Sequence, residues 1–551
     1  MNNVKNLSII LLLSLGLVSF SQAKSDCNSG CDTSCSDSCD DDCNGDCNDD
    51  CDDDCNSAHG RTSTFFRPRP VTTDLTYRNN LTFYNRYHDA RCNFFTWDSS
   101  FIYTKSRKGK RLGAGFLCAN PLTVSEFAGA DIAALNLQLS AFDDATPPST
   151  NFESTFSICP ERKTFSWLNQ FYFNLDCFWT GLWASVDFAV VHARHELNIN
   201  EDLTNGPSDL PTPIAGNTAE ENAALAALPA NVREAFDQLN TFANDCRHTG
   251  VDDLLFRVGY DYNYCSNDHI GIYFLGVAPT GKRFDNTRWF QPIVGSKHGA
   301  IGVGLTGDYT LWCDEQYNAD LVFQTEVMYQ FRLRHEEART FDYNNGPCSR
   351  FRLVVERNEA VVGGTTVAAA NNTIAVPGID NLRACVRVEP RHQLEWWANL
   401  HYQWCNWGGE ISYNLHFRDR EHVTDCNNFD FNNFGIFSFC CPDEAFPLTT
   451  QSDRLVSDQP AAATANPTGT NPCVQDATFT VITDKDVNFC SGAAQRVLTH
   501  KIAGAISYNS VWCDCYPFAV GFGAGYEFVS KKDSRHALEN WHIQGKFEVS
   551  F

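Results

Sequence analysis

Apolar and polar residues alternate along several stretches of the chain, with the period of two that is typical of β-strands. In the longest stretch, Phe323 and Val327 lie on one face, while Gln324 and Glu326 lie on the other. Six such stretches stand out, at residues 170–177, 182–192, 254–264, 320–334, 410–420 and 541–551. The pattern predicts an all-β protein.

A soluble β-sandwich shows the same alternation, so the length of the strands decides between a sandwich and a membrane barrel. The stretches run to ~10–15 residues, which is what a tilted strand needs to cross a bilayer. Strands in lipid must pair every backbone polar group, and only a closed barrel does so. We therefore predict a transmembrane antiparallel β-barrel in the outer membrane of a Gram-negative bacterium. Tryptophans near the predicted strand ends would form its interfacial girdles, at Trp396, Trp397, Trp404, Trp407 and Trp512.

The last stretch ends on an aromatic residue, as expected for the closing strand of such a barrel. Phe547, Val549 and Phe551 lie on one face of it. A soluble protein more often ends in a polar, frayed tail. We interpret these three residues as the signal that the barrel assembly machinery recognises.

The predicted barrel covers residues 91–551. At ~25–33 residues per strand with its share of loop, this length gives about 14–18 strands and an aqueous lumen. Polar faces of the strands would line the pore, with candidates at Asp187, Arg257, Asp261, Glu326, Arg332 and Arg418. Residues 197–251, 357–383 and 422–495 are expected to be long loops, and residues 61–90 a linker or first strand region.

The chain opens with a segment typical of secretory signal peptides. Lys5 precedes an apolar run over residues 7–20, and small residues lead to Ala23. We predict cleavage after Ala23, which removes residues 1–23. No later stretch is long and apolar enough for a transmembrane helix.

The chain contains 25 cysteines, and in the oxidising compartment beyond the inner membrane they are expected to form disulfide bonds.

An acidic tail, expected to be disordered, follows at residues 24–60. One lysine and twelve aspartates between residues 24 and 56 give it a charge of −11. Cysteine recurs there at every fourth position, at Cys27, Cys31, Cys35, Cys39, Cys43, Cys47, Cys51 and Cys55. Three roles are open for this cysteine repeat. It could form disulfides with neighbouring envelope proteins, bind zinc or calcium, or remain a solvated tail with local disulfide loops.

Two motifs suggest chemistry but do not fit it. Residues 276–282 match most of a phosphate-binding loop, yet Arg283 stands where Ser or Thr is required and no helix follows. His192 and His195 are three apart, which on a strand places them on opposite faces and prevents them from sharing a metal. We predict no catalytic residues, so the protein is not expected to be an enzyme. No cofactor is expected apart from a metal on the cysteine repeat, and the net charge of −25 argues against nucleic acid as a partner.

Several segments together indicate a family resemblance. These are residues 275–281 at a strand end, 291–295 before the glycine-rich stretch 299–307, and 339–342. With the many cysteines and the terminal Phe551, the chain resembles the cysteine-rich, major-outer-membrane-protein-like porins of Chlamydia-related bacteria over residues 91–551. The resemblance implies an abundant porin whose cysteines cross-link the envelope. It implies no individual functional residues.

The function expected from the sequence is passive diffusion of ions and small hydrophilic solutes through an outer-membrane porin, with envelope cross-linking through cysteines. Its partners would be outer-membrane lipid, other cysteine-rich envelope proteins and, in a homo-oligomer, further copies of the chain. The alternative is a structural envelope protein or adhesin in which the barrel is only an anchor and the cysteine tail is the working part.

Overall fold

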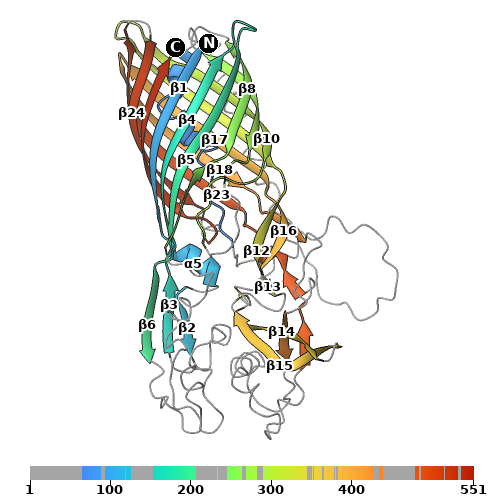
Figure 1. Ribbon diagram of the computed structural model, residues 1–551. Helices are drawn as coiled ribbons and strands as arrows, with labels where there is room; N and C mark the ends of the chain where they lie inside the picture. The colour runs from blue at the N-terminus through green and yellow to red at the C-terminus, as the bar shows by residue number, and fades with distance from the viewer. Residues whose placement is uncertain are drawn as a thin grey trace, which may run out of the picture. The chain divides into compact units, whose positions relative to one another are not determined.

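A computed structural model of the chain shows a closed antiparallel barrel of twelve strands in the part that it describes (Figure 1). The described residues are 65–88, 94–117, 120–125, 153–205, 233, 245–263, 268–281, 290–343, 350, 353–362, 365–377, 379, 383–425, 434–438, 478–482, 486–513, 516–530 and 535–551. The barrel strands are β1 (Phe95–Arg107), β4 (Glu161–Asn174), β5 (Leu182–Glu196), β8 (Leu254–Asn263), β9 (His269–Ala278), β10 (Ala300–Asp314), β11 (Ala319–Arg332), β17 (Arg391–Trp404), β18 (Trp407–Arg418), β23 (Val497–Trp512), β24 (Tyr516–Val529) and β25 (Glu539–Ser550).

The first and last strands close the barrel. β1 pairs with β25 on one side and with β4 on the other, and β4 pairs with β5. Beyond the last ladder pair, Phe95 and Phe551 each donate a backbone hydrogen bond to the other's carbonyl, over 3.2 and 2.7 Å. The all-β transmembrane barrel predicted from the sequence is therefore confirmed, and the predicted closing strand closes it.

The strand number predicted from the sequence was wrong. Twelve strands form the barrel, not 14–18, because more of the chain lies in the connections than the estimate allowed. Those connections contain four further sheets in the described residues. One consists of β2 (Leu122–Ser125), β3 (Glu153–Ile158) and β6 (Ile199–Asn205), and a second of β12 (His335–Thr340), β16 (Arg383–Glu389) and β19 (His422–Asp425). The third pairs β13 (Asp342–Tyr343) with β22 (Val487–Asn488), and the fourth consists of β14 (Leu353–Val362), β15 (Thr365–Pro377), β20 (Phe434–Ser438) and β21 (Thr478–Val481). β7 (Asp245–Val251) pairs with the end of β5. The helices α5 (Lys110–Leu117) and η7 (Phe489–Gly492) also lie in connections.

The two ends of the barrel differ in their connections. At one, the short-turn end, neighbouring strands are joined through residues 175–181, 264–268, 315–318, 405–406 and 513–515. At the other, the long-loop end, they are joined through residues 108–160, 197–253, 279–299, 333–390, 419–496 and 530–538. β1 begins and β25 finishes at the short-turn end. The three loops expected from the sequence all fall at the long-loop end, and 108–160 is a fourth long connection that the sequence analysis did not identify.

The outer surface of the barrel is apolar. On β9, for example, Ile270, Ile272 and Phe274 are exposed, whereas the residues between them are buried or face the interior. Trp404, Trp407 and Trp512 are exposed at the short-turn end, where a girdle was predicted. Trp397 was misassigned to the girdle, because it points inward and is fully buried. None of the helices in the described residues is long and apolar enough to span a membrane.

Residues 65–88, which we call the lumen segment, lie inside the barrel. They form two short helices, α3 (Leu75–Asn79) and α4 (Phe83–His88), and contain no strand. Leu75 and Phe83 belong to the same buried cluster as the inward-facing Trp183, Tyr273 and Trp397 of the barrel wall. The linker or first strand expected over residues 61–90 is thus, in its described part, an internal helical segment.

Candidate functional site: the barrel lumen

Turn-forming residues divide the lumen segment into its short helices. Asp74 caps α3, with its side chain accepting a hydrogen bond from the Thr76 backbone N–H over 3.0 Å. Leu81 then takes a backbone φ of 76°, a left-handed conformation that ends any continuous helix. The segment holds four arginines and a single carboxylate, Asp74. It is therefore a cationic insert in a wall whose inward face carries many carboxylates.

The middle of the lumen holds a buried cluster of two arginines and two carboxylates. Arg78 from α3 lies 3.2 Å from Asp187 on β5 and 3.8 Å from Glu326 on β11. Arg257 on β8 faces the same two carboxylates at 3.2 and 3.9 Å. All four side chains are essentially inaccessible to solvent, so each charge depends on the others for compensation.

Neutral side chains complete this central cluster. Asn79 donates to Glu326 over 2.8 Å, and the Tyr273 hydroxyl donates to its other oxygen over 2.5 Å. Gly304 is the register partner of Tyr273 on the glycine-rich strand β10. A Cβ at Gly304 would come within 2.1 Å of the Tyr273 ring, so a side chain there would displace the ring. The glycine therefore lets Tyr273 reach Glu326.

At the long-loop end the lumen segment is held by a second cluster. Arg67 pairs with Glu421 and lies 3.1 Å from Glu337. Arg339 lies 2.6 Å from Glu337 and 3.2 Å from Glu421, and its guanidinium lies over the ring of Phe65. Burial alone would raise the pKa of Glu337, but the charges of Arg67 and Arg339 hold it well below its usual range. The start of the segment is thereby fixed to residues that follow β11 and β18.

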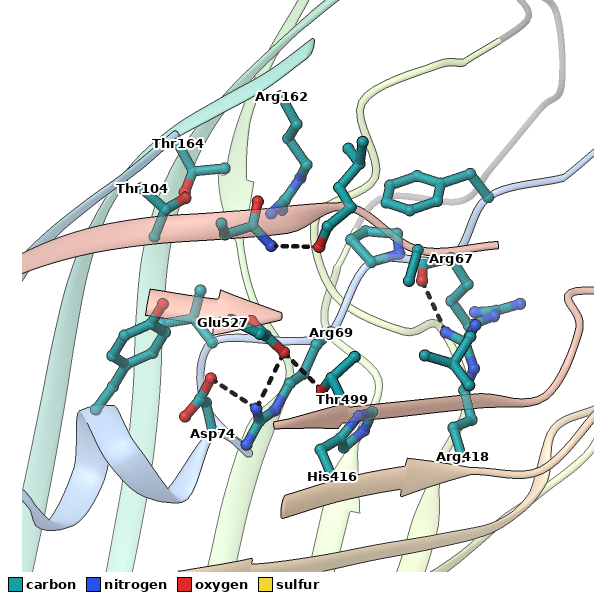
Figure 2. A pocket seen from close by; sticks show the side chains of 18 residues that line it. Arg67, Arg69, Asp74, Thr104, Arg162, Thr164, His416, Arg418, Thr499 and Glu527 are labelled. Atoms are coloured by element: carbon teal, nitrogen blue, oxygen red, sulfur yellow. Dashed lines mark hydrogen bonds and ion pairs between the residues drawn. The ribbon is translucent and has the colours of Figure 1, made fainter. Parts of the chain in front are cut away.

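A third group surrounds Arg69 (Figure 2). Its guanidinium reaches Asp74 at 3.2 Å and Glu527 at 3.6 Å. Glu395, which the figure does not draw, lies 2.7 Å away. Lys501 on β23 also pairs with Asp74. These contacts border a cavity of about 60 Å³ that is lined by Thr104, Arg162, Thr164, His416, Arg418 and Thr499, among others. The cavity has room for a few water molecules.

At the short-turn end the segment makes polar and aromatic contacts. Tyr84 donates to Asp320 over 2.6 Å and stacks on the ring of His401 at 4.5 Å. The Lys546 ammonium donates to the carbonyls of Arg78 and Asn80, over 2.7 and 3.1 Å. The segment therefore runs the length of the lumen, from Glu421 at one end to Asp320 at the other.

The six predicted pore-lining residues all lie on barrel strands with their side chains inside. Asp187, Arg257 and Glu326 form the central cluster with Arg78. Arg418 donates to the Arg67 carbonyl over 2.7 Å, and Arg332 donates to Gln393 over 2.8 Å. Their exposed fractions run from 0% to 8%, the largest being that of Asp261. Their side chains point inward, but all six are buried where open water was expected, and the lumen segment itself contacts Asp187, Glu326 and Arg418.

Sequence reasoning missed the lumen segment itself. Its helices are too short to show an apolar stripe, and their polar residues look like those of a linker. One signal was available, because four arginines within 24 residues could pair with carboxylates predicted on the inner faces, such as Asp187 and Glu326. The residues of the assembly signal lie on β25 and at its end, with Phe547 and Phe551 exposed and Val549 buried. Ala23 and the cysteine repeat at 27–55 lie outside the described residues.

Cysteines mark the short-turn end. Cys177, Cys313, Cys405 and Cys513 lie in or beside four of the turns, and all four are exposed free thiols. Cys405 and Cys513 adopt φ angles of 50° and 54°, a region normally left to Gly, Asn or Asp. Cys265 occupies the fifth turn in sequence but falls outside the described residues. Within those residues, no group of three or more His, Cys, Asp or Glu side chains is arranged to hold a metal ion.

The two motifs set aside in the sequence analysis lie on barrel strands or beside them. His192 and His195 lie on β5, the first exposed and the second buried, so they do face opposite sides. The motif that resembles a phosphate-binding loop is described over residues 276–281, which cover the end of β9 and the turn after it. Neither forms a site with the lumen clusters.

Comparison with known proteins supports no assignment to a family. No family model matches the chain, and no curated protein matches it. Among solved structures, an outer membrane channel from Pseudomonas putida F1 is similar at 8% identity and a TM-score of 0.34, covering 83% of this chain and 96% of that one. The transport unit of the autotransporter AIDA-I from Escherichia coli is similar at 8% identity and a TM-score of 0.29, covering 88% and 99%. A Pseudomonas aeruginosa FadL homologue is similar at 7% identity and a TM-score of 0.26, covering 88% and 98%. At these scores the likenesses carry no argument about function.

Proposed function

We propose that the protein is an outer-membrane porin for ions and small hydrophilic solutes, closed in this conformation by the lumen segment. The observation that carries the proposal is the chemistry of the contact between segment and wall. Ion pairs and hydrogen bonds hold the segment at three levels, around Arg67, Arg69 and Arg78. A polar contact of this kind can be replaced by water, so the wall would remain hydrated if the segment moved.

The wall left by such a movement has the character of a selective pore. Its inward carboxylates include Asp98, Asp187, Asp261, Glu326, Glu395, Glu410 and Glu527, and its inward cations include Arg257, Arg332, Arg418, Lys501 and Lys546. Rings of charged side chains determine which ions pass through a pore. The apolar outer surface and the exposed tryptophans at the short-turn end support placement in the outer membrane.

Planar bilayer recordings test this function with two proteins. The full chain is expected to be mostly silent with rare openings, and a variant lacking residues 65–88 is expected to conduct steadily. The deletion variant must first show the gel-mobility shift on heating that reports a folded barrel. A folded deletion variant that remains silent would contradict the porin and favour the barrel as an anchor.

A second function, envelope cross-linking, is favoured by the turn cysteines. A residue other than glycine in the left-handed region costs about 1–2 kcal/mol, and Cys405 and Cys513 occupy it in turns where Asn or Gly would be better suited. We infer that their exposed thiols form disulfides with other cysteine-rich envelope proteins. Replacing Cys177, Cys313, Cys405 and Cys513 by Ser should remove a set of reducible high-mass bands from non-reducing gels. An unchanged set of bands would contradict cross-linking through the turn cysteines.

A further inference from the structure

Four neighbouring strands carry a basic residue at the same level of the outer surface, at the long-loop end. β1, β4 and β5 lie side by side (Figure 1), and β7 pairs with the end of β5. Their register places four partly exposed cations opposite one another in a single row, which consists of Lys105, Lys163, Arg194 and Arg247. Like charges that face each other across strands are destabilising. The row therefore requires compensation from other groups.

Three carboxylates in the next row supply part of this compensation. Glu161, Glu196 and Asp245 are register partners of one another, two residues beyond the cations on β4, β5 and β7. Each carboxylate lies 2.5 to 3.5 Å from two cations of the basic row. Ion pairs in such exposed positions are weak and are screened by salt. Another anion can therefore compete for the cations.

Further cations follow where β1 ends. Five of the seven residues in 105–111 are basic, in a chain whose net charge is −25. Glu539 pairs with Lys108 and Arg111, at 2.6 and 3.8 Å. Arg107 and Lys110 are exposed and form no ion pair with a described residue. We call the whole set the basic rim, and it consists of Lys105, Arg107, Lys108, Lys110, Arg111, Lys163, Arg194 and Arg247. Within the described residues, these eight cations form ion pairs with only four carboxylates.

The basic rim borders the apolar surface that faces lipid. Along β1, the outward side chains run from Phe101 through Tyr103 to Lys105, and on β4, Phe165 and Lys163 stand at the two corresponding levels. Phe101 and Phe165 are each 51% exposed. Successive outward positions on a strand are ~7 Å apart. The cations therefore follow the aromatic side chains at the depth where lipid headgroups begin.

We propose that the basic rim binds the phosphate groups of an anionic lipid in the outer leaflet of the outer membrane. Phosphate offers negative charge and several acceptor oxygens, which arginine and lysine bind through charge-assisted hydrogen bonds. Clusters of Lys and Arg beside a membrane-spanning segment attract anionic headgroups. Barrels in this membrane place their longer loops outside, which brings the rim to the outer leaflet.

A lipid fits this surface better than a free phosphate ion does. The row from Lys105 to Arg247 crosses four strands and is ~14 Å long, which is wider than a single phosphate group. Acyl chains would lie along Phe101 and Phe165 while the headgroup meets the cations. The inference rests on the outer-membrane location in the proposed function, and is independent of whether the barrel conducts.

Binding of lipid A, a diphosphorylated glycolipid, to the purified full chain in a neutral detergent tests the proposal. The test variant is Arg107→Gln with Lys110→Gln, which removes two charges of the rim without breaking an ion pair between described residues. Arg334→Gln with Arg387→Gln is the matched control, because both arginines lie at the long-loop end and Arg334 follows β11, the strand opposite β1 in the ring. All variants must first show the heat-dependent gel shift of a folded barrel. Lys105→Gln with Arg107→Gln replaces the test variant if that variant fails to fold.

The test variant should bind lipid A at least tenfold more weakly than the wild type, because two cations near an anionic surface contribute more than one factor of ten in affinity. The control variant should bind as the wild type does, and at matched ionic strength inorganic phosphate should displace the lipid no more than chloride does. Equal binding by the test variant and the wild type would overturn the proposal. An equal loss in the control variant, or displacement of the lipid by inorganic phosphate, would overturn it as well.

These outcomes are separate from those of the bilayer recordings. A barrel that is silent in bilayers can still bind lipid A through its rim, so failure of the porin leaves this binding intact. A rim that does not bind lipid A leaves the conductance of the variant lacking residues 65–88 unchanged.

Discussion

At the scale of single residues, the lumen is governed by charge compensation in a buried setting. Arg78, Asp187, Arg257 and Glu326 balance one another out of contact with water, so removal of any one would leave a buried charge without its partner. The sequence alone predicted three of the four on inward faces from alternation. It could not supply Arg78, because a partner from a distant segment leaves no trace in the local pattern.

Replacing Arg78 by Ala is expected to loosen the lumen segment. The change leaves two buried carboxylates facing one arginine, and removing one partner of a buried pair costs about 3–5 kcal/mol. Chymotrypsin should then cleave the purified variant at Tyr77 or Phe83 at least tenfold faster than the wild type. Arg247→Ala is the matched control, because Arg247 lies outside the barrel with more than half of its side chain exposed. Equal cleavage of the Arg78 variant and wild type would contradict the anchoring role.

Asp252 predicts a dependence on pH. Its carboxylate accepts from the backbone N–H groups of Val71 and Thr72, over 2.7 and 3.0 Å. Burial, aided by the charge of Asp253, raises the pKa of Asp252 to about 6, from a usual 3.8. A carboxyl whose pKa is higher in the folded protein stabilises the fold fully below its unfolded pKa and loses that contribution as pH rises through 6.

The wild type should therefore lose about 1 kcal/mol of folding stability between pH 5 and pH 7 through this group. In Asp252→Asn the amide oxygen still accepts from Val71 and Thr72 but cannot ionise. Thermal unfolding of both proteins is measured at each pH. The Tm of the variant minus that of the wild type should increase as the pH rises. A difference in Tm that stays constant between pH 5 and pH 7 would rule out this linkage.

At the scale of elements, alternation identified the strands and their faces well. All six stretches singled out in the sequence overlap barrel strands, and Phe323 and Glu326 face the sides assigned to them. The assignment failed where a residue lies in a place that is unusual for its type. Trp397 was placed in a girdle because tryptophan is common there, yet it faces inward, where its indole donates to Asn80 over 2.9 Å. Local pattern cannot show that a barrel contains something to pack against.

The closing strand gives a prediction at this scale. Deleting Phe551 removes its two backbone hydrogen bonds to Phe95 and the aromatic end of the assembly signal. We expect the signal peptide to be cleaved normally while most of the protein accumulates in the periplasm, as cell fractionation would show. Phe551→Trp, which keeps both the backbone and an aromatic ring, should insert as the wild type does. Normal insertion of the deletion variant would count against the closing-strand interpretation.

At the scale of the whole molecule, the sequence predicted the barrel but not its contents or its strand number. Length divided by an average strand share assumes ordinary loops, and here the connections at 333–390 and 419–496 hold sheets of their own. The lumen segment escaped notice for a related reason, since charge complementarity between residues 65–88 and the wall becomes visible only once the barrel is closed. The strand number and the lumen segment both depend on how segments far apart in the sequence pack together, which a local pattern does not show.

The last prediction concerns the eight cysteines of the repeat at 27–55. An extended tail of ~30 residues can reach up to ~100 Å, so its thiols can meet many neighbours in an oxidising setting. Replacing all eight by Ser should remove one set of reducible high-mass complexes from non-reducing gels, and the barrel should still fold and insert. Complexes that persist unchanged in this variant would assign the cross-linking to cysteines outside the repeat, such as those of the turns. Zinc or calcium that copurifies in stoichiometric amounts with the wild type, but not with the tail variant, would instead assign the repeat to metal binding.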